Sequence, residues 1–300
     1  MKVDRIISSL LVMLCIATTA YGQEDIFDSL DDVQEESNNY ATAFFKSTRV
    51  VNSPSIELTA PGVMNFVVQH RFGTVNNGLY DLFGIDNSEV RLSFDFGITP
   101  WLMVGIGRSG LDKTYDLNAK AQVLRQQTGK KNIPVSVAFY GGTYYKTLKS
   151  SLPLTAANRT SYLGQVIIAR KFSSSLSVQV SPTFVHSNLV STKDVDNDVL
   201  ALGFGARQKL SKRVSLNVDY VYRMPGNFEQ GTYNSLAFGV DIETGGHVFS
   251  LHLTNSRGMF DKSYVTETTG DLANGDLYFG FNINRVFTVA KSKEVKAAGL

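Results

Sequence analysis

The sequence has little cysteine, little tryptophan and few prolines. Its 300 residues include one Cys, one Trp and 7 Pro. The cysteine, Cys15, lies in an apolar stretch near the N-terminus. If that stretch is removed, the chain has no thiol for a disulfide, a nucleophile or a metal site. Long apolar runs are missing too: after that stretch, the sequence never reaches the 18 or so consecutive apolar residues that a membrane-spanning helix needs.

Charge of one sign is also lacking. With 29 basic and 27 acidic residues the net charge is +2, which gives no field strong enough to indicate nucleic acid as a partner. Hydrophobic residues make up 43%, too many for a disordered chain, while charged residues are only 19%. What is abundant is Gly (25), Phe (19) and Tyr (13), and the aromatic residues favour strands over helices.

The N-terminus predicts export. Lys2 and Arg5 precede the apolar stretch 6–17, and the small residues of Ala20-Tyr21-Gly22 suit a cleavage site. We therefore expect residues 1–22 to be a signal peptide. Residues 23–42 are rich in Asp and Glu and predict a flexible acidic lead, because like charges repel and no core can form there. Residues 43–62, interrupted by Pro54 and ended by Pro61-Gly62, predict a segment that covers or plugs one mouth of the following domain.

From residue 63 the dominant pattern is alternation of apolar and polar residues, which is typical of strands because successive side chains point to opposite faces. Between Glu89 and Thr99, for example, Val90, Leu92, Phe94, Phe96 and Ile98 share one face. The pattern predicts about twelve strands, near 63–73, 88–99, 102–109, 114–125, 133–147, 161–171, 176–187, 198–209, 214–224, 233–243, 247–255 and 275–288.

The connections between these strands are longer at one end than at the other. Long loops on one rim and short turns on the opposite rim are typical of bacterial outer-membrane barrels. We therefore predict an all-β fold: a closed antiparallel outer-membrane β-barrel of about 12 strands over residues 63–290, followed by a basic tail, 291–300. An even strand number places both termini in the periplasm. A secreted soluble β-sandwich for adhesion or carbohydrate binding would also alternate, and stays open as an alternative.

The same alternation directs a set of charged side chains into the lumen. Because buried charges must be paired or hydrated, these side chains either close the interior by salt bridges or line a narrow aqueous path. The lumen-lining candidates are Arg71, Arg91, Asp95, Lys120, Arg207, Asp219, Arg223 and Asp241.

Three motifs point to chemistry but fit ordinary barrel structure better. Gly105–Gly110 has the spacing of a nucleotide-binding loop, yet strand residues follow it where a helix is needed. Asp194, Asp196 and Asp198 offer carboxylates for a hard cation, but the rest of a calcium loop is missing. Ser250 and His252 share a strand face, a spacing usually too wide for a catalytic pair. We expect no catalytic residue, metal or cofactor.

Five short stretches have a familiar sequence: Phe44–Asn52, Gln69–Gly73, Phe96–Thr99, Val104–Ser109 and Asp112–Asp116. Together they resemble a family of Bacteroidetes membrane-bound β-barrels of unknown function. The resemblance runs collinearly from about Ala43 to Val289. It implies an outer-membrane barrel in a Gram-negative envelope and assigns no site residues.

The sequence thus predicts a non-enzymatic outer-membrane barrel that acts as a narrow channel or a binding scaffold. An outer-membrane lipid hydrolase using Ser250 and His252 is the alternative from another class. Expected partners are outer-membrane lipid, lipopolysaccharide and the barrel insertion machinery, with no nucleic acid. Recognition by that machinery often uses a terminal aromatic residue, whereas here Phe287 is followed by a tail with Lys291, Lys293 and Lys296.

Overall fold

The structure of the protein is a computed structural model that describes residues 38–290. The expected signal peptide, the acidic lead up to residue 37 and the basic tail 291–300 lie outside the described residues. None of the helices in the described part is long and apolar enough to cross a membrane.

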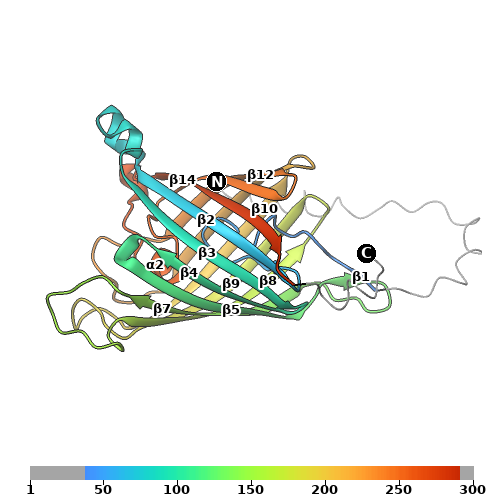
Figure 1. Cartoon of the computed structure of the whole chain (residues 1–300), viewed down its shortest axis with the longest axis horizontal. Coiled ribbons are helices and arrows are strands. Elements are labelled where there is room, and N and C mark those ends of the chain that lie inside the picture. The colour runs from blue at the N-terminus through green and yellow to red at the C-terminus, as the bar shows by residue number, and fades with distance from the viewer. Residues whose placement is uncertain (1–37, 291–300) are drawn as a thin grey trace, which may run out of the picture. The chain divides into compact units, whose positions relative to one another are not determined.

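The described residues form a barrel of twelve antiparallel strands, closed where the first barrel strand pairs with the last (Figure 1). Barrel strands that follow each other in the sequence are also adjacent in the wall. The strands are β2 (Val63–Thr74), β3 (Ser88–Thr99), β4 (Leu102–Ser109), β5 (Thr114–Leu124), β7 (Ser136–Lys146), β8 (Thr160–Lys171), β9 (Leu176–Ser187), β10 (Asp198–Lys209), β11 (Val214–Arg223), β12 (Ser235–Thr244), β13 (His247–Thr254) and β14 (Tyr278–Thr288).

Alternation along the strands separates a polar interior from an apolar exterior. In β11, Ser215, Asn217 and Asp219 are buried, whereas Leu216 and Val218 are exposed. A soluble sandwich would bury its apolar faces between two sheets, so the closed single wall with apolar residues outside shows that the sandwich alternative is wrong.

The strand bounds differ from the prediction by a few residues where irregular structure intervenes. β7 begins at Ser136, beyond Pro134, which cannot donate a ladder hydrogen bond. β14 begins at Tyr278, after the 3-10 turn η4 (Leu272–Asn274) and Gly275, whose φ is 75°. The short helices η2 (Val75–Gly84), η3 (Leu111–Lys113) and α2 (Asp261–Thr266) lie in loops and were not predicted.

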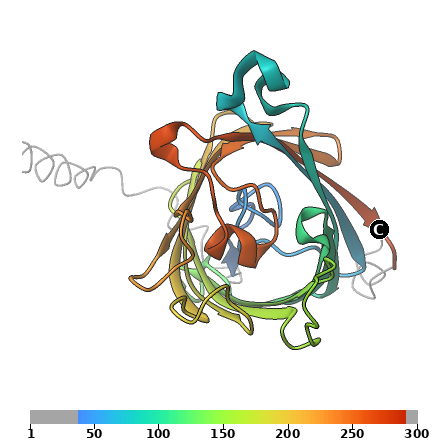
Figure 2. The ribbon, with the colours of Figure 1, turned by 90° about the vertical axis from the view of Figure 1, so that its left-hand side faces the viewer.

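The chain before the barrel folds into the lumen. β1 (Asn39–Tyr40) pairs with β6 (Gln127–Thr128) in the β5–β7 connection, at the end of the barrel that carries the short turns. Residues 41–62, called here the N-terminal segment, then lie inside the ring of strands (Figure 2). The loop between β13 and β14 brings α2 into the same ring from the long-loop end, so the two meet within the lumen.

Candidate functional site: the occupied lumen

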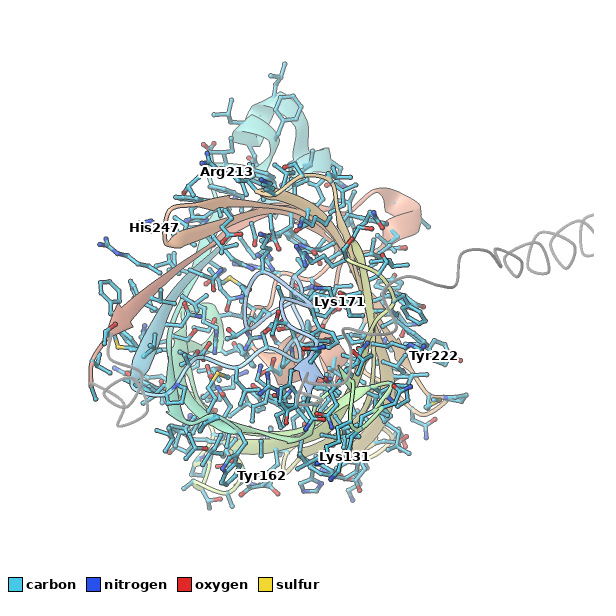
Figure 3. All side chains as sticks on the ribbon, turned by 90° about the vertical axis from the view of Figure 1, so that its right-hand side faces the viewer. Lys131, Tyr162, Lys171, Arg213, Tyr222 and His247 are labelled. Atoms are coloured by element: carbon cyan, nitrogen blue, oxygen red, sulfur yellow. The ribbon has the colours of Figure 1, made fainter. Side chains whose placement is uncertain are left out.

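All eight charged residues singled out from the alternation are buried, with 0 to 8% of their surface exposed. Five of them hydrogen-bond to the N-terminal segment: Arg71, Asp95, Lys120, Arg207 and Asp219. The view from the short-turn end shows side chains filling the ring, with Lys171 pointing toward the entering chain (Figure 3). The Nζ of Lys171 donates to the Thr42 carbonyl at 2.6 Å.

Asp219 on β11 binds a tight turn of the N-terminal segment. Its carboxylate accepts hydrogen bonds from the backbone N–H groups of Val51 (3.3 Å), Asn52 (2.9 Å) and Ser53 (2.8 Å). The Ser53 hydroxyl donates a fourth, also at 2.8 Å. A buried carboxylate is stable only with such partners, so Asp219 and the turn satisfy each other.

Cations and amides of the wall bind the carbonyl groups of the same segment. Lys120 donates to the carbonyl of Ser55 at 2.8 Å, and Arg207 donates to that of Ala43 at 2.9 Å. Gln179 reaches the carbonyl of Pro54 at 2.8 Å. An irregular chain inside a barrel needs these bonds, since its backbone has no ladder of its own.

Glu57 folds the N-terminal segment back on itself. Its carboxylate accepts from the backbone N–H of Phe44 (2.6 Å) and of Phe45 (3.2 Å). Burial raises the pKa of Glu57, and the two backbone hydrogen bonds oppose that rise. Phe44 and Phe45, also buried, belong to the apolar core that fills this part of the lumen.

The N-terminal segment and α2 are joined through Asp261. Arg49 pairs with this carboxylate at 2.8 Å, and Tyr140 and Tyr144 donate to it at 2.5 and 2.8 Å. Tyr264 donates to its other oxygen at 3.1 Å. Burial alone would raise the pKa of Asp261, but the charge of Arg49 and these hydrogen bonds lower it to about 2. We call these five residues the Asp261 cluster.

The remaining lumen candidates bond to other parts of the wall and its loops. Arg91 forms a fully buried ion pair with Asp116 at 2.6 Å. Arg223 donates to Thr232 at 2.9 Å and lies over the ring of Phe228. Asp241 accepts from Ser250.

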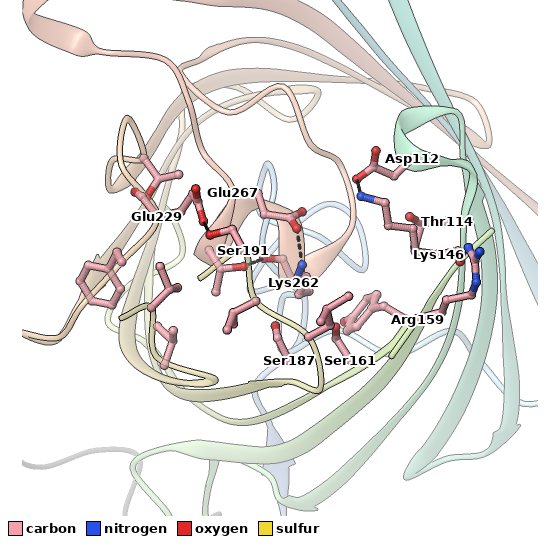
Figure 4. Close-up of a pocket in the computed structure, with 18 of the residues that line it drawn as sticks. Asp112, Thr114, Lys146, Arg159, Ser161, Ser187, Ser191, Glu229, Lys262 and Glu267 are labelled. Atoms are coloured by element: carbon pink, nitrogen blue, oxygen red, sulfur yellow. Dashed lines mark hydrogen bonds and ion pairs between the residues drawn. The ribbon is translucent and has the colours of Figure 1, made fainter. Parts of the chain in front are cut away.

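One cavity lies at each end of the lumen. The one at the long-loop end, of about 410 Å³, is bordered by α2 and carries the ion pairs Lys146–Asp112 and Lys262–Glu267 (Figure 4). The one at the short-turn end, of about 380 Å³, is bordered by the N-terminal segment and Glu243. Of the Asp261 cluster, Tyr144 borders the cavity at the long-loop end.

A family model described as a membrane bound beta barrel domain (DUF5777) matches residues 45–287. The chain belongs to this family. The predicted resemblance to a membrane-bound β-barrel family is therefore confirmed, while its restriction to Bacteroidetes stays a prediction. The match covers both the barrel and the part of the N-terminal segment that carries Arg49.

Several solved porin and outer-membrane protein structures are similar to this membrane-bound β-barrel. A NanC porin is 10% identical over 75% of this chain and 98% of its own, with a TM-score of 0.49. A KdgM porin is 9% identical over 75% and 99%, with a TM-score of 0.43. Omp33 of Acinetobacter baumannii is 9% identical over 75% and 97%, with a TM-score of 0.40. Among proteins with curated descriptions, no sequence matches.

The motifs weighed in the sequence occupy structural positions in this membrane-bound β-barrel. Ser250 donates to Asp241, and His252 contacts Arg71, so each member of the Ser–His pair is bonded elsewhere. Asp196 accepts from the backbone of Asn227, and Asp198 pairs with His186. Within residues 38–290, no three His, Cys, Asp or Glu side chains are grouped as metal ligands.

The glycines of the Gly105–Gly110 motif leave room for charged lumen side chains. A Cβ on Gly105 would lie 2.6 Å from Asn118, and one on Gly107 would lie 2.5 Å from both Arg91 and Asp116. Both glycines lie in β4, and the motif is followed only by the three-residue turn η3 and then by β5, without the helix that a nucleotide-binding loop requires.

Sequence reasoning missed Arg49 and Asp261, the residues that join the two ends of the lumen. Both lie outside the barrel strands, where no period-two pattern shows which way a side chain points. The one available signal was the presence of charged residues next to aromatic ones in segments short enough to be enclosed, such as Phe260-Asp261.

Proposed function

We propose that the protein is a non-enzymatic outer-membrane channel that is closed by its own N-terminal segment. The observation that carries the proposal is the buried Arg49–Asp261 ion pair, which joins chain segments entering from opposite mouths. A channel needs a polar lumen, and the charged interior of this barrel provides one once the N-terminal segment or α2 moves.

Opening would expose a path lined by both signs of charge. With the N-terminal segment displaced, Arg71, Lys120 and Asp219 would lose partners and regain water, so their present hydrogen bonds favour the closed state. Mixed charges in a restricted lumen suit a small polar solute rather than an apolar one.

The proposed orientation places the short turns and both termini in the periplasm and the long loops outside the cell. Bacterial outer-membrane barrels with an even strand number share this arrangement. Under this orientation the 410 Å³ cavity faces the exterior and is the first space that an entering solute meets.

A binding scaffold with a fixed interior is the second candidate. It is favoured by the number of wall side chains that bind the N-terminal segment, which resembles a packed core more than a loosely held plug. In that case the cavity at the long-loop end would bind a ligand without passing it on.

Conductance across planar bilayers distinguishes the two candidates. We expect the parent protein to be closed with brief openings, and Asp261→Asn or Arg49→Gln to raise the open fraction by about tenfold or more, since breaking a buried ion pair costs several kcal/mol. Asp112→Asn breaks the partly exposed ion pair with Lys146 and serves as the matched control with unchanged openings.

Equal, near-zero conductance in the parent and both variants would overturn the channel proposal and favour the scaffold. The hydrolase alternative is tested separately with Ser250→Ala and His252→Ala: we expect purified parent and variants to be equally inactive on phospholipid vesicles. Hydrolysis by the parent that either substitution abolishes would contradict the non-enzymatic role.

A further inference from the structure

We propose that the loop Val75–Ile85 between β2 and β3 is a membrane anchor that inserts its apolar tip into the headgroup region of the lipid beside the barrel. This rim loop, which contains η2, carries the most exposed apolar side chains of the described chain: Tyr80 is 94% exposed and Leu79 79%. Leu82, Phe83 and Ile85 are also exposed. Soluble surfaces rarely gather so many large apolar side chains in one short loop.

The base of the rim loop is fixed to the barrel. The backbone N–H of Val75 donates to the carbonyl of Leu277 at 2.8 Å, and the Asn76 amide donates to Asp276 at 2.5 Å. Gly84 lies so close to Gly73 of β2 that a Cβ would collide with its backbone. The fold therefore sets the place at which the rim loop leaves the wall.

The rim loop projects sideways from the ring. Figure 1 shows it at the long-loop end of β2, and Figure 2, which looks toward that end, shows it outside the circle of strands. The tip therefore lies over the surroundings of the barrel, away from the mouth of the lumen. For a barrel in a bilayer, those surroundings are lipid.

The apolar surface continues from the rim loop down the wall. Phe72, near the end of β2, stacks on Phe279 of β14 with ring centroids 5.7 Å apart, on the outer face next to the loop. Aromatic residues gather at this level of membrane proteins because their rings suit the boundary between headgroups and acyl chains. This continuity with the lipid-facing wall favours lipid over a protein partner as the occupant.

The tip of the rim loop contains two residues with a strained backbone. Leu82 and Phe83 have φ values of 45° and 54°, a left-handed conformation that is disfavoured for residues with a Cβ. Strain of this kind persists where the surrounding structure imposes it and often marks a functional segment. Leu82 and Phe83, which adopt this conformation here, are 50% and 47% exposed.

The test places a tryptophan at the tip and measures how near it is to lipid. Tyr80→Trp is made with Trp101→Phe, which removes the only native tryptophan, and the purified full chain is reconstituted in phosphatidylcholine vesicles. Lys193→Trp, in the exposed loop between β9 and β10, is the matched control. Retention of the folded, fast-migrating form on unheated gels checks that both variants fold.

We expect the Tyr80→Trp emission to be blue-shifted and quenched by lipids brominated near the headgroup, at least twofold more than that of Lys193→Trp. Emission and quenching equal to those of the control would overturn the proposal. A blue shift without bromine quenching, together with chemical cross-linking of two copies, would show that a second copy covers the loop and would overturn it as well.

Discussion

At the scale of single residues, the lumen is stable because its charged side chains have polar partners. Alternation along the strands directed eight charged side chains inward, since direction follows from sequence position alone, but Asp116 of β5, which is also buried, was not among them. Alternation could not predict partners: Arg91 pairs with Asp116 across β4, and Asp219 with a turn far away in sequence. Those pairings depend on strand register and on the path of the N-terminal segment.

The Arg91–Asp116 pair should contribute far more than an exposed pair. We expect Arg91→Gln to lower the free energy of unfolding by about 3–5 kcal/mol, because it leaves a buried carboxylate without its counter-charge. Lys146→Gln, which breaks the partly exposed pair with Asp112, should cost less than about 1 kcal/mol. Urea titration of the purified barrels, followed by the loss of the folded gel form, measures both, and equal costs would contradict the prediction.

The Asp261 cluster should make closure sensitive to strong acid. The pKa of Asp261 is lowered from 3.8 to about 2, so its contribution to the closed state is complete above pH 4 and is lost as the pH falls through about 2. That contribution amounts to about 2 kcal/mol, since one pKa unit corresponds to 1.36 kcal/mol.

We therefore expect the open fraction of the parent in planar bilayers to rise as the pH falls from 4 to 2. Asp261→Asn has no carboxylate to protonate, so its open fraction should be similar at pH 4 and pH 2. An open fraction of the parent that stays constant over this range would show that the ion pair does not hold the lumen closed.

At the scale of elements, the barrel strands were predictable and the structures inside the ring were not. All twelve barrel strands were predicted to within a few residues, because long alternating segments bounded by turn residues define a strand locally, whereas the two-residue strands β1 and β6 were not predicted. The N-terminal segment was predicted only as a cover or plug, since its irregular path follows from contacts with distant wall residues such as Lys120 and Asp219.

Asp219 should be the main attachment of the N-terminal segment. Asp219→Ala removes the acceptor of four hydrogen bonds and should release the turn Val51–Ser53, so that trypsin cleaves after Lys46 or Arg49 in the folded barrel. Asp241→Ala, another buried lumen carboxylate but one that bonds to Ser250, should leave those sites protected. Mass spectrometry of the fragments identifies the cleavage sites. Equal protection of both variants would show that Asp219 is not the main attachment of the N-terminal segment.

At the scale of the whole molecule, the barrel has two unlike ends. The short-turn end receives the N-terminal segment and includes the Thr244–His247 turn between β12 and β13, whereas the long-loop end carries the rim loop and the entry of α2. A barrel with two similar ends would give no basis for predicting its orientation in a membrane. The loop lengths in the sequence already contained this information, because turn length can be read directly between strands.

Cysteine labelling tests the orientation, and the near absence of native cysteine makes it simple. Ser151→Cys, in the exposed loop between β7 and β8, should react with a membrane-impermeant maleimide on intact cells. Ser174→Cys, in the exposed turn between β8 and β9, should react only after the outer membrane is permeabilised. Cleavage in the predicted signal peptide removes Cys15, so the parent should not be labelled; the reverse pattern would invert the orientation.

The pairing of β2 with β14 also fixes an order in time. The wall cannot close until residues 278–288 have been synthesised, whereas the N-terminal segment that it encloses is among the first parts of the chain to be made. Arg49 therefore meets Asp261 only after nearly the whole chain has been made. The buried ion pair is thus a late product of assembly, made between an early and a late part of the polypeptide.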